Sequence, residues 1–182
     1  LDDADDINVL SAGDQLDIGI GRIPAATLSA ANDYVDKLEL YHQPAARGEW
    51  RNELSFIADD EDFNLHLRDA EEITARVLAT NNRFQLRKIY LDAYFQESDA
   101  AGSRYPAVNQ AISDGMQGGN LIWNYSGHGG FRRLAEEVVL DQSIADSWQQ
   151  NGRLPLFITA TCDFAPYDNP AINSLGEYLL LK

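Results

Sequence analysis

Short runs of apolar residues alternate along the chain with longer segments in which apolar residues recur every three or four positions. The short runs are typical of buried β-strands, and the longer segments are typical of amphipathic helices. The pattern predicts strands at residues 17–22, 53–58, 87–92, 119–125 and 154–161. It predicts helices at residues 27–41, 64–79, 107–116, 141–150 and 174–181.

Local signals mark the ends of these helices and the faces that they bury. Thr27 and Asn64 are predicted N-caps, because their short polar side chains can accept a hydrogen bond from a free N–H group of the first turn. Gly118 and Gly119 are predicted to end the third helix. In the first two helices, one apolar stripe each is expected to face the core: Ala31, Val35 and Leu38, then Ala70, Ile73 and Val77.

Strands that alternate with helices predict an α/β protein with a mostly parallel sheet. The most apolar strand segments, 121–123 and 156–158, are expected at the centre of the sheet with both faces covered. The length of 182 residues suits one domain, so we expect residues 1–182 to form a single unit. Because the chain starts before a strand and stops in a helix that should lead to another strand, we expect this domain to be incomplete at both ends.

The charge balance excludes two classes of partner. Fourteen Lys and Arg against twenty-nine Asp and Glu give a formal charge of −15. Binding to nucleic acid or to an anionic membrane surface requires basic side chains that neutralise phosphate, so we expect neither. The acidic run at residues 1–6 is interpreted either as a solvated loop or as a set of calcium ligands, and structural calcium stays an open possibility.

Cysteine and histidine are scarce, which limits the chemistry. The single cysteine, Cys162, excludes an internal disulfide. With only His42, His66 and His128 beside it, a structural zinc site of four Cys and His ligands is nearly excluded. His42 and His66 fall on predicted helices and are expected at their surfaces. A lone cysteine is most often a buried inert thiol, so its surroundings must argue for any other role.

Two short segments directly after predicted strands carry most of the chemical signal. Residues 124–130 (NYSGHGG) follow one apolar strand and residues 159–163 (TATCD) follow another. Ligands of parallel sheets bind beyond the carboxyl ends of the strands, so neighbouring strands would bring His128 and Cys162 into one crevice. A thiolate needs a base and an oxyanion needs N–H donors; His128 can be the base, and Gly129 and Cys162 can supply the donors. An α/β-hydrolase is discounted because the chain lacks a Gly-x-Ser-x-Gly elbow.

These motifs resemble those of the caspase-like cysteine peptidases, and most closely those of the gingipain family, C25. The segment 124–129 is similar to the family's Asn-Tyr-Thr-Gly-His-Gly, with Ser126 in place of Thr. The segments 20–24 (IGRIP) and 56–60 (FIADD) fall in the family's order. A finer resemblance, to the sortases of type IX secretion in Bacteroidota, is carried by 88–94, 104–112 and 160–164 followed by 168–170.

The family resemblance implies a fold and a set of residue roles. It implies a caspase-like three-layer α/β/α domain in which Cys162 is the nucleophile and His128 is the general base and later acid. Gly129 and Cys162 would supply the oxyanion donors. An acidic residue would stand beside the histidine; Asp59, Asp60 and Glu61 compete for that place, and Asp60 is our choice.

The finer resemblance implies substrates and a location. The substrates would be C-terminal sorting domains of secreted proteins, cleaved through a thioester and joined to a lipopolysaccharide amine at the outer membrane of a Gram-negative bacterium. An outer-membrane shuttle or anchor protein would be a partner, and no cofactor is implied. Two alternatives stay open: a secreted gingipain-like endopeptidase, and a scaffold that keeps the fold without catalysis.

Overall fold

The computed structural model describes residues 21–100, 102–149 and 151–182. The acidic run at residues 1–6 and most of the strand predicted at 17–22 lie outside the described residues. Within the described ranges, no helix is both long enough and apolar enough to cross a bilayer.

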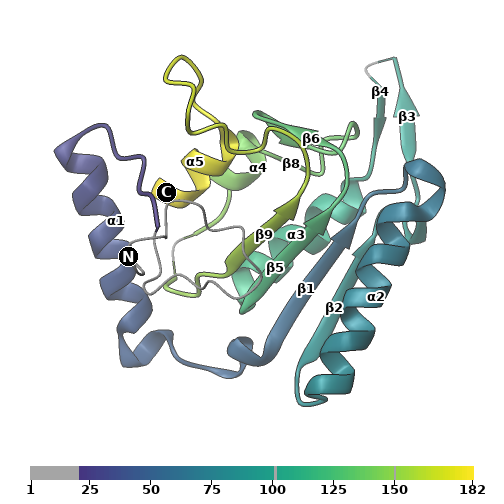
Figure 1. Ribbon diagram of the computed structural model, residues 1–182, viewed down its shortest axis with the longest axis horizontal. Helices are drawn as coiled ribbons and strands as arrows, with labels where there is room; N and C mark the ends of the chain where they lie inside the picture. Colours follow the sequence, from purple (N-terminus) through teal and green to yellow (C-terminus); the bar gives the residue numbers. More distant parts are fainter. Residues whose placement is uncertain (1–20, 101, 150) are drawn as a thin grey trace, which may run out of the picture.

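Among the residues that the structure describes, the centre is a sheet of four strands, and their parallel arrangement is the one predicted. The order across the sheet is β2 (Gln85–Tyr90), β1 (Glu53–Ala58), β5 (Ile122–Ser126) and β9 (Leu156–Ala160). All three neighbouring pairs run parallel, so the carboxyl ends of the four strands lie at one end of the sheet. This end is uppermost in Figure 1, where the loops after β5 and β9 leave the sheet.

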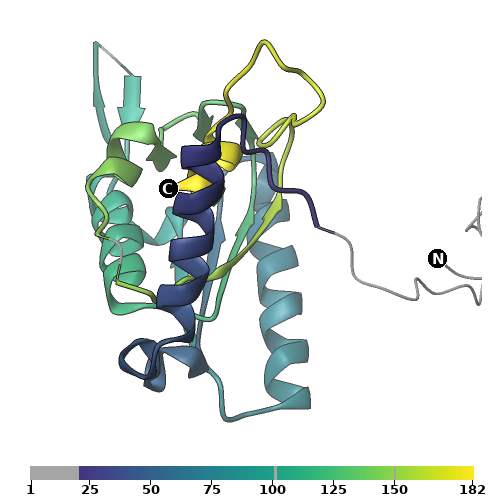
Figure 2. The ribbon, with the colours of Figure 1, turned by 90° about the vertical axis from the view of Figure 1, so that its left-hand side faces the viewer.

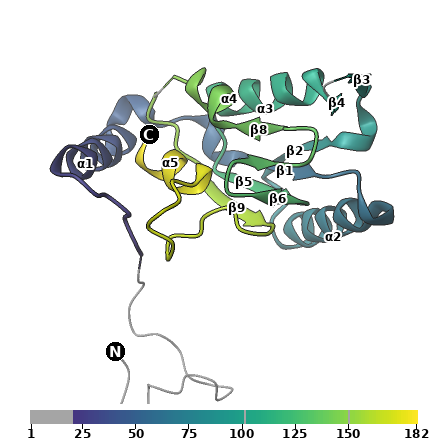
Figure 3. The same ribbon diagram turned by 90° about the horizontal axis from the view of Figure 1, so that it is seen from above.

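Helices cover both faces of this sheet and make it a three-layer α/β/α fold. Viewed from above, α3 (Pro106–Gly118) and α4 (Gln142–Asp146) lie on one face and α2 (Leu65–Thr80) lies on the other (Figure 3). Helices α1 (Leu28–His42) and α5 (Leu175–Leu181) contact each other beside the β9 end of the sheet. The predicted fold class is therefore confirmed.

The predicted helix ends are mostly confirmed, and their caps explain why. The Thr27 hydroxyl accepts a hydrogen bond from the N–H of Ala30 at 3.1 Å. Gly119 ends α3 with a φ of +89°, which glycine adopts without strain. Ser174 forms a reciprocal capping box with Glu177 at the start of α5. Asn64 precedes α2 as predicted, but its own φ is +62° and its side chain caps nothing.

The core lies on both sides of β1 and β5, which are buried along almost their whole length. The ring of Trp123 stacks on Tyr125 at a centroid distance of 6.2 Å and packs against Phe157 at 4.7 Å. Strands buried on both faces require continuous apolar runs, and this is the pattern that predicted them.

The prediction that residues 156–158 are central and covered on both faces was wrong. In the described part of the chain, β9 is the edge strand, and Leu156 and Ile158 expose 61% and 43% of their surface. The physical reason is the position of α2, which contacts β1 and β5 and does not extend over β9.

The two predicted apolar stripes reach the core only in part. Val35 and Leu38 of α1 are exposed because this helix lies beside the sheet and buries no residue completely. In α2, the completely buried positions are Ala70 and Thr74, and Ile73 is exposed. The fourth predicted helix is shorter than expected, since α4 ends at Asp146.

Several short elements were not predicted, because two or three residues give no periodicity. Two antiparallel sheets combine β3 with β4 and β6 with β7 and β8. Their strands are β3 (Glu97–Asp99), β4 (Gly102–Arg104), β6 (Gly129–Gly130), β7 (Arg133–Leu134) and β8 (Leu140–Asp141). Four 3₁₀ helices add to them: η2 (Pro44–Ala46), η3 (Glu49–Asn52), η4 (Asp62–Asn64) and η5 (Leu91–Ala93). Figure 2 shows the β3–β4 hairpin and the loop before α5 projecting at the same end of the sheet.

Candidate active site

The loops that carry His128 and Cys162 leave neighbouring strands at the same level. Ser126 of β5 pairs with Ala160 of β9, and the N–H of Gly127 donates to the carbonyl oxygen of Ala160 at 3.2 Å. His128 and Cys162 each follow these paired residues by two positions. The topology therefore brings the two predicted residues to one end of one strand pair.

The loop of His128 is fixed by a buried network. Its backbone N–H donates to Oδ2 of Asp59 at 2.9 Å, and its carbonyl oxygen accepts the hydroxyl of Tyr125 at 2.6 Å. The same hydroxyl lies 3.2 Å from Oδ2 of Asp59. Burial raises the pKa of Asp59 although these hydrogen bonds oppose the shift, and burial together with the Asp59 charge raises the pKa of Tyr125. Asp59 is thus a structural partner of the His128 backbone.

The imidazole of His128 faces two acidic side chains in the turn before α2. Its Nε2 lies 2.9 Å from Oδ2 of Asp62 and 3.5 Å from Oε2 of Glu61. An ionised carboxylate only accepts hydrogen bonds, so Nε2 carries the proton and donates it to Asp62. The lone pair of the neutral ring is then on Nδ1, where it is available to a thiol.

An unusual turn places Asp62 there. Asp62, Phe63 and Asn64 are three consecutive non-glycine residues with left-handed backbone angles, φ +56°, +54° and +62°. Such backbone costs on the order of 1–3 kcal/mol for each residue and is concentrated at functional sites. The turn reverses the chain between β1 and α2 and directs the Asp62 carboxylate at the imidazole.

Asp60, our predicted acidic partner of the histidine, has a different neighbour. Its Oδ2 accepts the hydroxyl of Tyr105 at 2.6 Å, and its Oδ1 is buried without a hydrogen-bond partner. Burial and the Asp60 charge raise the pKa of the Tyr105 hydroxyl. Asp62 and Glu61 are the carboxylates next to the ring, so a direct catalytic role for Asp60 stays a prediction that this geometry does not favour.

Asp60 belongs instead to a buried acidic cluster behind His128. One carboxylate oxygen each of Asp59, Asp60 and Glu137 lies within 4.8 Å of the others. Oε2 of Glu137 is buried and unpaired, and burial followed by the charges of Asp60 and Asp59 raises the pKa of Glu137. These oxygens are ligands that a hard cation accepts. The calcium predicted for residues 1–6 is a separate matter; those residues lie outside the described ranges, and it stays a prediction.

Cys162 lies in an exposed loop, which contradicts the default interpretation as a buried inert thiol. The residue that follows, Asp163, has a left-handed φ of +45°. Within the described part of the chain, no hydrogen bond joins the Cys162 thiol to the His128 imidazole. The structure brings together the two loops and does not show a closed thiol–imidazole pair.

Gly129 is suitably placed for its predicted role as an oxyanion donor. In an antiparallel ladder, hydrogen-bonded pairs alternate with pairs that exchange no hydrogen bond. The N–H of Ala135 donates to the carbonyl oxygen of His128, so the next pair, Gly129 with Leu134, exchanges none. Its N–H is therefore available to a ligand. A Cβ at this position would lie 2.6 Å from Oγ1 of Thr161, the neighbour of Cys162. Only glycine lets the two loops approach this closely.

Backbone N–H groups at the start of α5 donate hydrogen bonds to the loop after β5 and to the loop after β9. The N–H of Leu175 donates to the carbonyl oxygen of Phe131 at 2.7 Å, just beyond the His128 loop. The N–H of Gly176 donates to the carbonyl oxygen of Phe164 at 3.2 Å, just beyond Cys162. One helix start therefore fixes the spacing between the two candidate catalytic segments.

Four residues of this site were not predicted from the sequence. Asp62, Tyr125 and Thr161 were not singled out, and His66 was expected at a helix surface. His66 instead has a side chain that is only 14% exposed, and its ring packs edge-on against the His128 ring at a centroid distance of 5.3 Å. The spacing of Asp62 and His66, one helical turn apart, was the one available signal.

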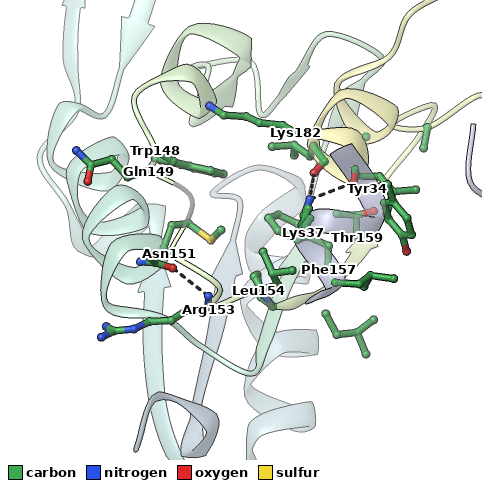
Figure 4. A pocket seen from close by; sticks show the side chains of 18 of the residues that line it. Tyr34, Lys37, Trp148, Gln149, Asn151, Arg153, Leu154, Phe157, Thr159 and Lys182 are labelled. Carbon is green, nitrogen blue, oxygen red and sulfur yellow. Dashed lines mark hydrogen bonds between the residues drawn. The ribbon is translucent and has the colours of Figure 1, made fainter. Parts of the chain in front are cut away.

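A separate apolar pocket of about 440 Å³ lies beneath α1 and α5 (Figure 4). The ammonium group of Lys37 donates to the carbonyl oxygens of Leu179 and Leu180 at 3.0 Å, and burial lowers its pKa to about 8. The pocket wall includes Trp148, Leu154 and Phe157 but neither His128 nor Cys162. It is therefore not the catalytic crevice.

Comparison with known proteins supports a family assignment. The sequence matches the profile of "Peptidase family C25" over residues 2–182. The fold is similar to the crystal structure of the Arg-specific cysteine proteinase gingipain R (RgpB), with a TM-score of 0.66 and 14% identity over 87% of this chain. It is also similar to the complex of Porphyromonas gingivalis RgpB pro- and mature domains, with a TM-score of 0.69 and 16% identity over 91% of this chain. Curated proteins gave no match. The chain spans 34% and 37% of the two solved chains.

Proposed function

The chain belongs to peptidase family C25, and from this premise we propose that it carries the catalytic cysteine and histidine of a cysteine peptidase. The register of β5 and β9 is the strongest support for this proposal. Ser126 pairs with Ala160, and His128 and Cys162 each lie two residues beyond that pair. The exposed thiol and the imidazole held by Asp62 fit the roles of nucleophile and base.

The proposed reaction is acyl transfer at a peptide bond. Nδ1 of His128 takes the proton of the thiol, and Sγ of Cys162 forms a bond to the carbonyl carbon. The N–H groups of Gly129 and Cys162 stabilise the oxyanion. As the C–N bond breaks, His128 returns the proton to the leaving amine and a thioester is left. Asp62 keeps Nε2 protonated and stabilises the imidazolium.

A small rearrangement of the loop precedes this chemistry, because the thiol and the ring are not yet hydrogen-bonded. Catalytic hydrogen bonds commonly tighten only when the substrate is bound. The exposed loop of Cys162 can move without breaking the network that fixes His128, since the hydrogen bonds of that network end at Asp59 and Tyr125.

We further propose a PorU-type role, cleavage of C-terminal sorting domains during type IX secretion with transfer of the new end to a lipopolysaccharide amine. The sequence resemblance in segments 88–94, 104–112 and 160–164 supports it. An amine that attacks the thioester in place of water gives the joined product. The outer-membrane location, the anchor or shuttle partner and the absence of a cofactor belong to the same proposal.

The first test is the rate at which iodoacetamide labels Cys162 at neutral pH. Fast labelling that slows markedly in His128→Ala is expected, because the imidazole generates the thiolate. His42→Ala, which changes the histidine at the end of α1, is the matched control and should label like the parent. Slow labelling that is the same in all three proteins would contradict the catalytic pair and favour the scaffold.

The second test separates the two peptidase hypotheses by substrate. The protein is incubated with a fusion that ends in a type IX sorting domain and, separately, with short peptides that contain Arg or Lys. Mass spectrometry identifies a free carboxylate or an amine-joined product. Cleavage of the fusion alone supports the sortase role, and cleavage of the short peptides alone supports a gingipain-like endopeptidase.

A further inference from the structure

We propose that Asp62, His66 and His128 form a Zn²⁺ site, and that a bound zinc ion switches off His128 as a general base. The binding of the ion stands independently of the function proposed above, whereas the inhibition rests on it. The three residues come from the loop after β5 and from the start of α2, and no other described residues combine histidine and carboxylate in this way.

The separations between the ligand atoms fit a tetrahedral ion. Oδ2 of Asp62 lies 2.9 Å from Nε2 of His128 and 3.4 Å from Nε2 of His66. All three ligand atoms lie within 4.8 Å of one another. Zinc bonds of about 2.0–2.1 Å in a tetrahedron separate the ligand atoms by about 3.3 Å. Shifts of a few tenths of an ångström around Asp62, together with a closer approach of the two rings, would complete the site.

His66 gives an independent indication of a ligand. Its Nε2 is buried and has no hydrogen-bond partner, although it faces the Asp62 carboxylate at 3.4 Å. A buried polar atom without a partner is costly, and a bound metal ion would satisfy it. Two imidazole nitrogens with one carboxylate are a typical donor set for zinc and an unsuitable one for calcium or magnesium.

The site is open to solvent on the side of His128. The side chains of Asp62 and His128 are 50% and 45% exposed, so an ion can enter without opening the fold. Glu61, whose Oε2 is 3.5 Å from Nε2 of His128, or a water molecule can take the fourth position. The formal charge of −15 favours the approach of a cation.

Zinc would inhibit catalysis by changing which nitrogen of the His128 imidazole carries the proton. With Asp62 as partner, Nε2 of His128 holds the proton and Nδ1 holds the lone pair that accepts the thiol proton. A zinc ion takes the lone pair of Nε2, so the remaining proton of the neutral ring moves to Nδ1. Nδ1 can then no longer accept a proton from Cys162. The carboxylate selects the active tautomer and the metal selects the inactive one.

Binding is tested by calorimetric titration of Zn²⁺ into the Cys162→Ala protein. This substitution removes the thiol as a competing ligand. We expect one site per chain, with Asp62, His66 and His128 as the ligands. His66→Phe and His66→Gln should each weaken binding at least about tenfold. His42→Phe is the matched control and should bind like the parent. Co²⁺ in the same proteins should give the visible spectrum of a nitrogen- and oxygen-ligated tetrahedral ion, without a thiolate band.

Inhibition is tested on protein with Cys162 intact, by iodoacetamide labelling and peptide cleavage in increasing Zn²⁺. Both rates should fall in the parent and in His42→Phe, and a chelator should restore them. In His66→Phe and His66→Gln, each compared with its own rate in the absence of zinc, the inhibitory Zn²⁺ concentration should rise at least about tenfold.

Two results would overturn the proposal, and they differ from failure of the peptidase function. Absence of zinc binding in Cys162→Ala protein, or unchanged affinity in both His66 variants, excludes the site itself. Zinc binding that leaves the labelling rate unchanged excludes the switch. If no peptide is cleaved but zinc binds through His66, the metal site stands and only the peptidase assignment fails.

Discussion

The loop after β5 and the loop after β9 carry the two candidate catalytic residues, but they are held very differently. Strand β5 is buried between β1 and β9, and the backbone of His128 is bonded on both sides, to Asp59 and to Tyr125. Strand β9 is the edge of the described sheet, and Cys162 with Asp163 is exposed. The backbone of the base is fixed by buried partners although its imidazole is 45% exposed, whereas the nucleophile lies in an exposed loop beside an edge strand.

This difference matches what each residue must do. A general base needs one ring orientation and one tautomer, so a rigid buried network suits it. A nucleophile must be reached by a polypeptide, and an exposed loop beside an edge strand permits that. The three predictions below test this division, beginning with the largest expected effect.

Replacement of Cys162 by alanine should remove activity and leave the fold unchanged. Loss of the nucleophile should lower peptide cleavage by at least about a thousandfold. Because Cys162 is exposed, its truncation leaves no cavity, and the unfolding free energy should change by less than about 0.5 kcal/mol. Cleavage assays and thermal unfolding of the same preparation measure both. A large loss of stability would show that the loop after β9 is as tightly held as the loop after β5.

Replacement of Gly127 by alanine should destabilise the fold strongly. The added Cβ would lie 2.4 Å from Cβ of Asp59 and 2.6 Å from the hydroxyl of Tyr125. Both neighbours are buried, so the clash cannot be relieved cheaply, and we expect a loss of about 3 kcal/mol or more. Denaturant unfolding measures it.

Gly130→Ala is the matched control for this second prediction, because a Cβ there would meet no atom within 4 Å. This variant in the same loop should lose less than about 0.5 kcal/mol. Equal losses in the two variants would mean that the loop responds to any side chain and that the buried network around Asp59 and Tyr125 is not the cause.

The apolar strands and the convergence of His128 with Cys162 could be predicted because both follow from simple rules. Continuous apolar runs mark strands buried on two faces, and parallel strands end together. The exposure of Ile158 could not be predicted, since it depends on how far α2 extends across the sheet. Sequence periodicity says which face is apolar and not what covers it.

The partners of the histidine escaped prediction for a different physical reason. Asp60 was chosen from an acidic run in which every carboxylate is chemically equivalent. The left-handed turn at Asp62, Phe63 and Asn64 determines which carboxylate of the run faces the imidazole. These three residues include no glycine or proline, so the sequence does not predict the turn. His66 becomes part of the site only because the same turn sets the start of α2.

The smallest expected effect is a dependence of stability on pH that comes from the cluster behind His128. Burial raises the pKa of Glu137 and of Asp59, so each binds protons more readily in the folded protein than in the unfolded chain. A raised carboxyl pKa contributes stability at pH values below the unfolded pKa, and this contribution is lost as the pH rises through the folded pKa. The unfolding free energy should therefore increase as the pH falls from about 7 to about 5. Glu71, whose pKa is lowered by bonds from Lys88 and Tyr90, acts in the opposite direction, but only near and below its ordinary value of 4.5.

Glu137→Gln isolates the contribution of the cluster. The amide carries no charge beside Asp59 and Asp60, so the variant should be more stable than the parent by about 1 kcal/mol near pH 7 and should show a weaker pH dependence. Glu136→Gln removes the same charge from an exposed neighbouring position and controls for the general relief of repulsion in a chain of formal charge −15. Thermal unfolding of the three proteins across this pH range measures the difference. If both variants gain the same stability, the gain comes from the lower net charge, and repulsion within the cluster of Asp59, Asp60 and Glu137 is not its cause. If only Glu137→Gln gains stability, the cluster next to the His128 loop holds a carboxylate that favours its neutral form.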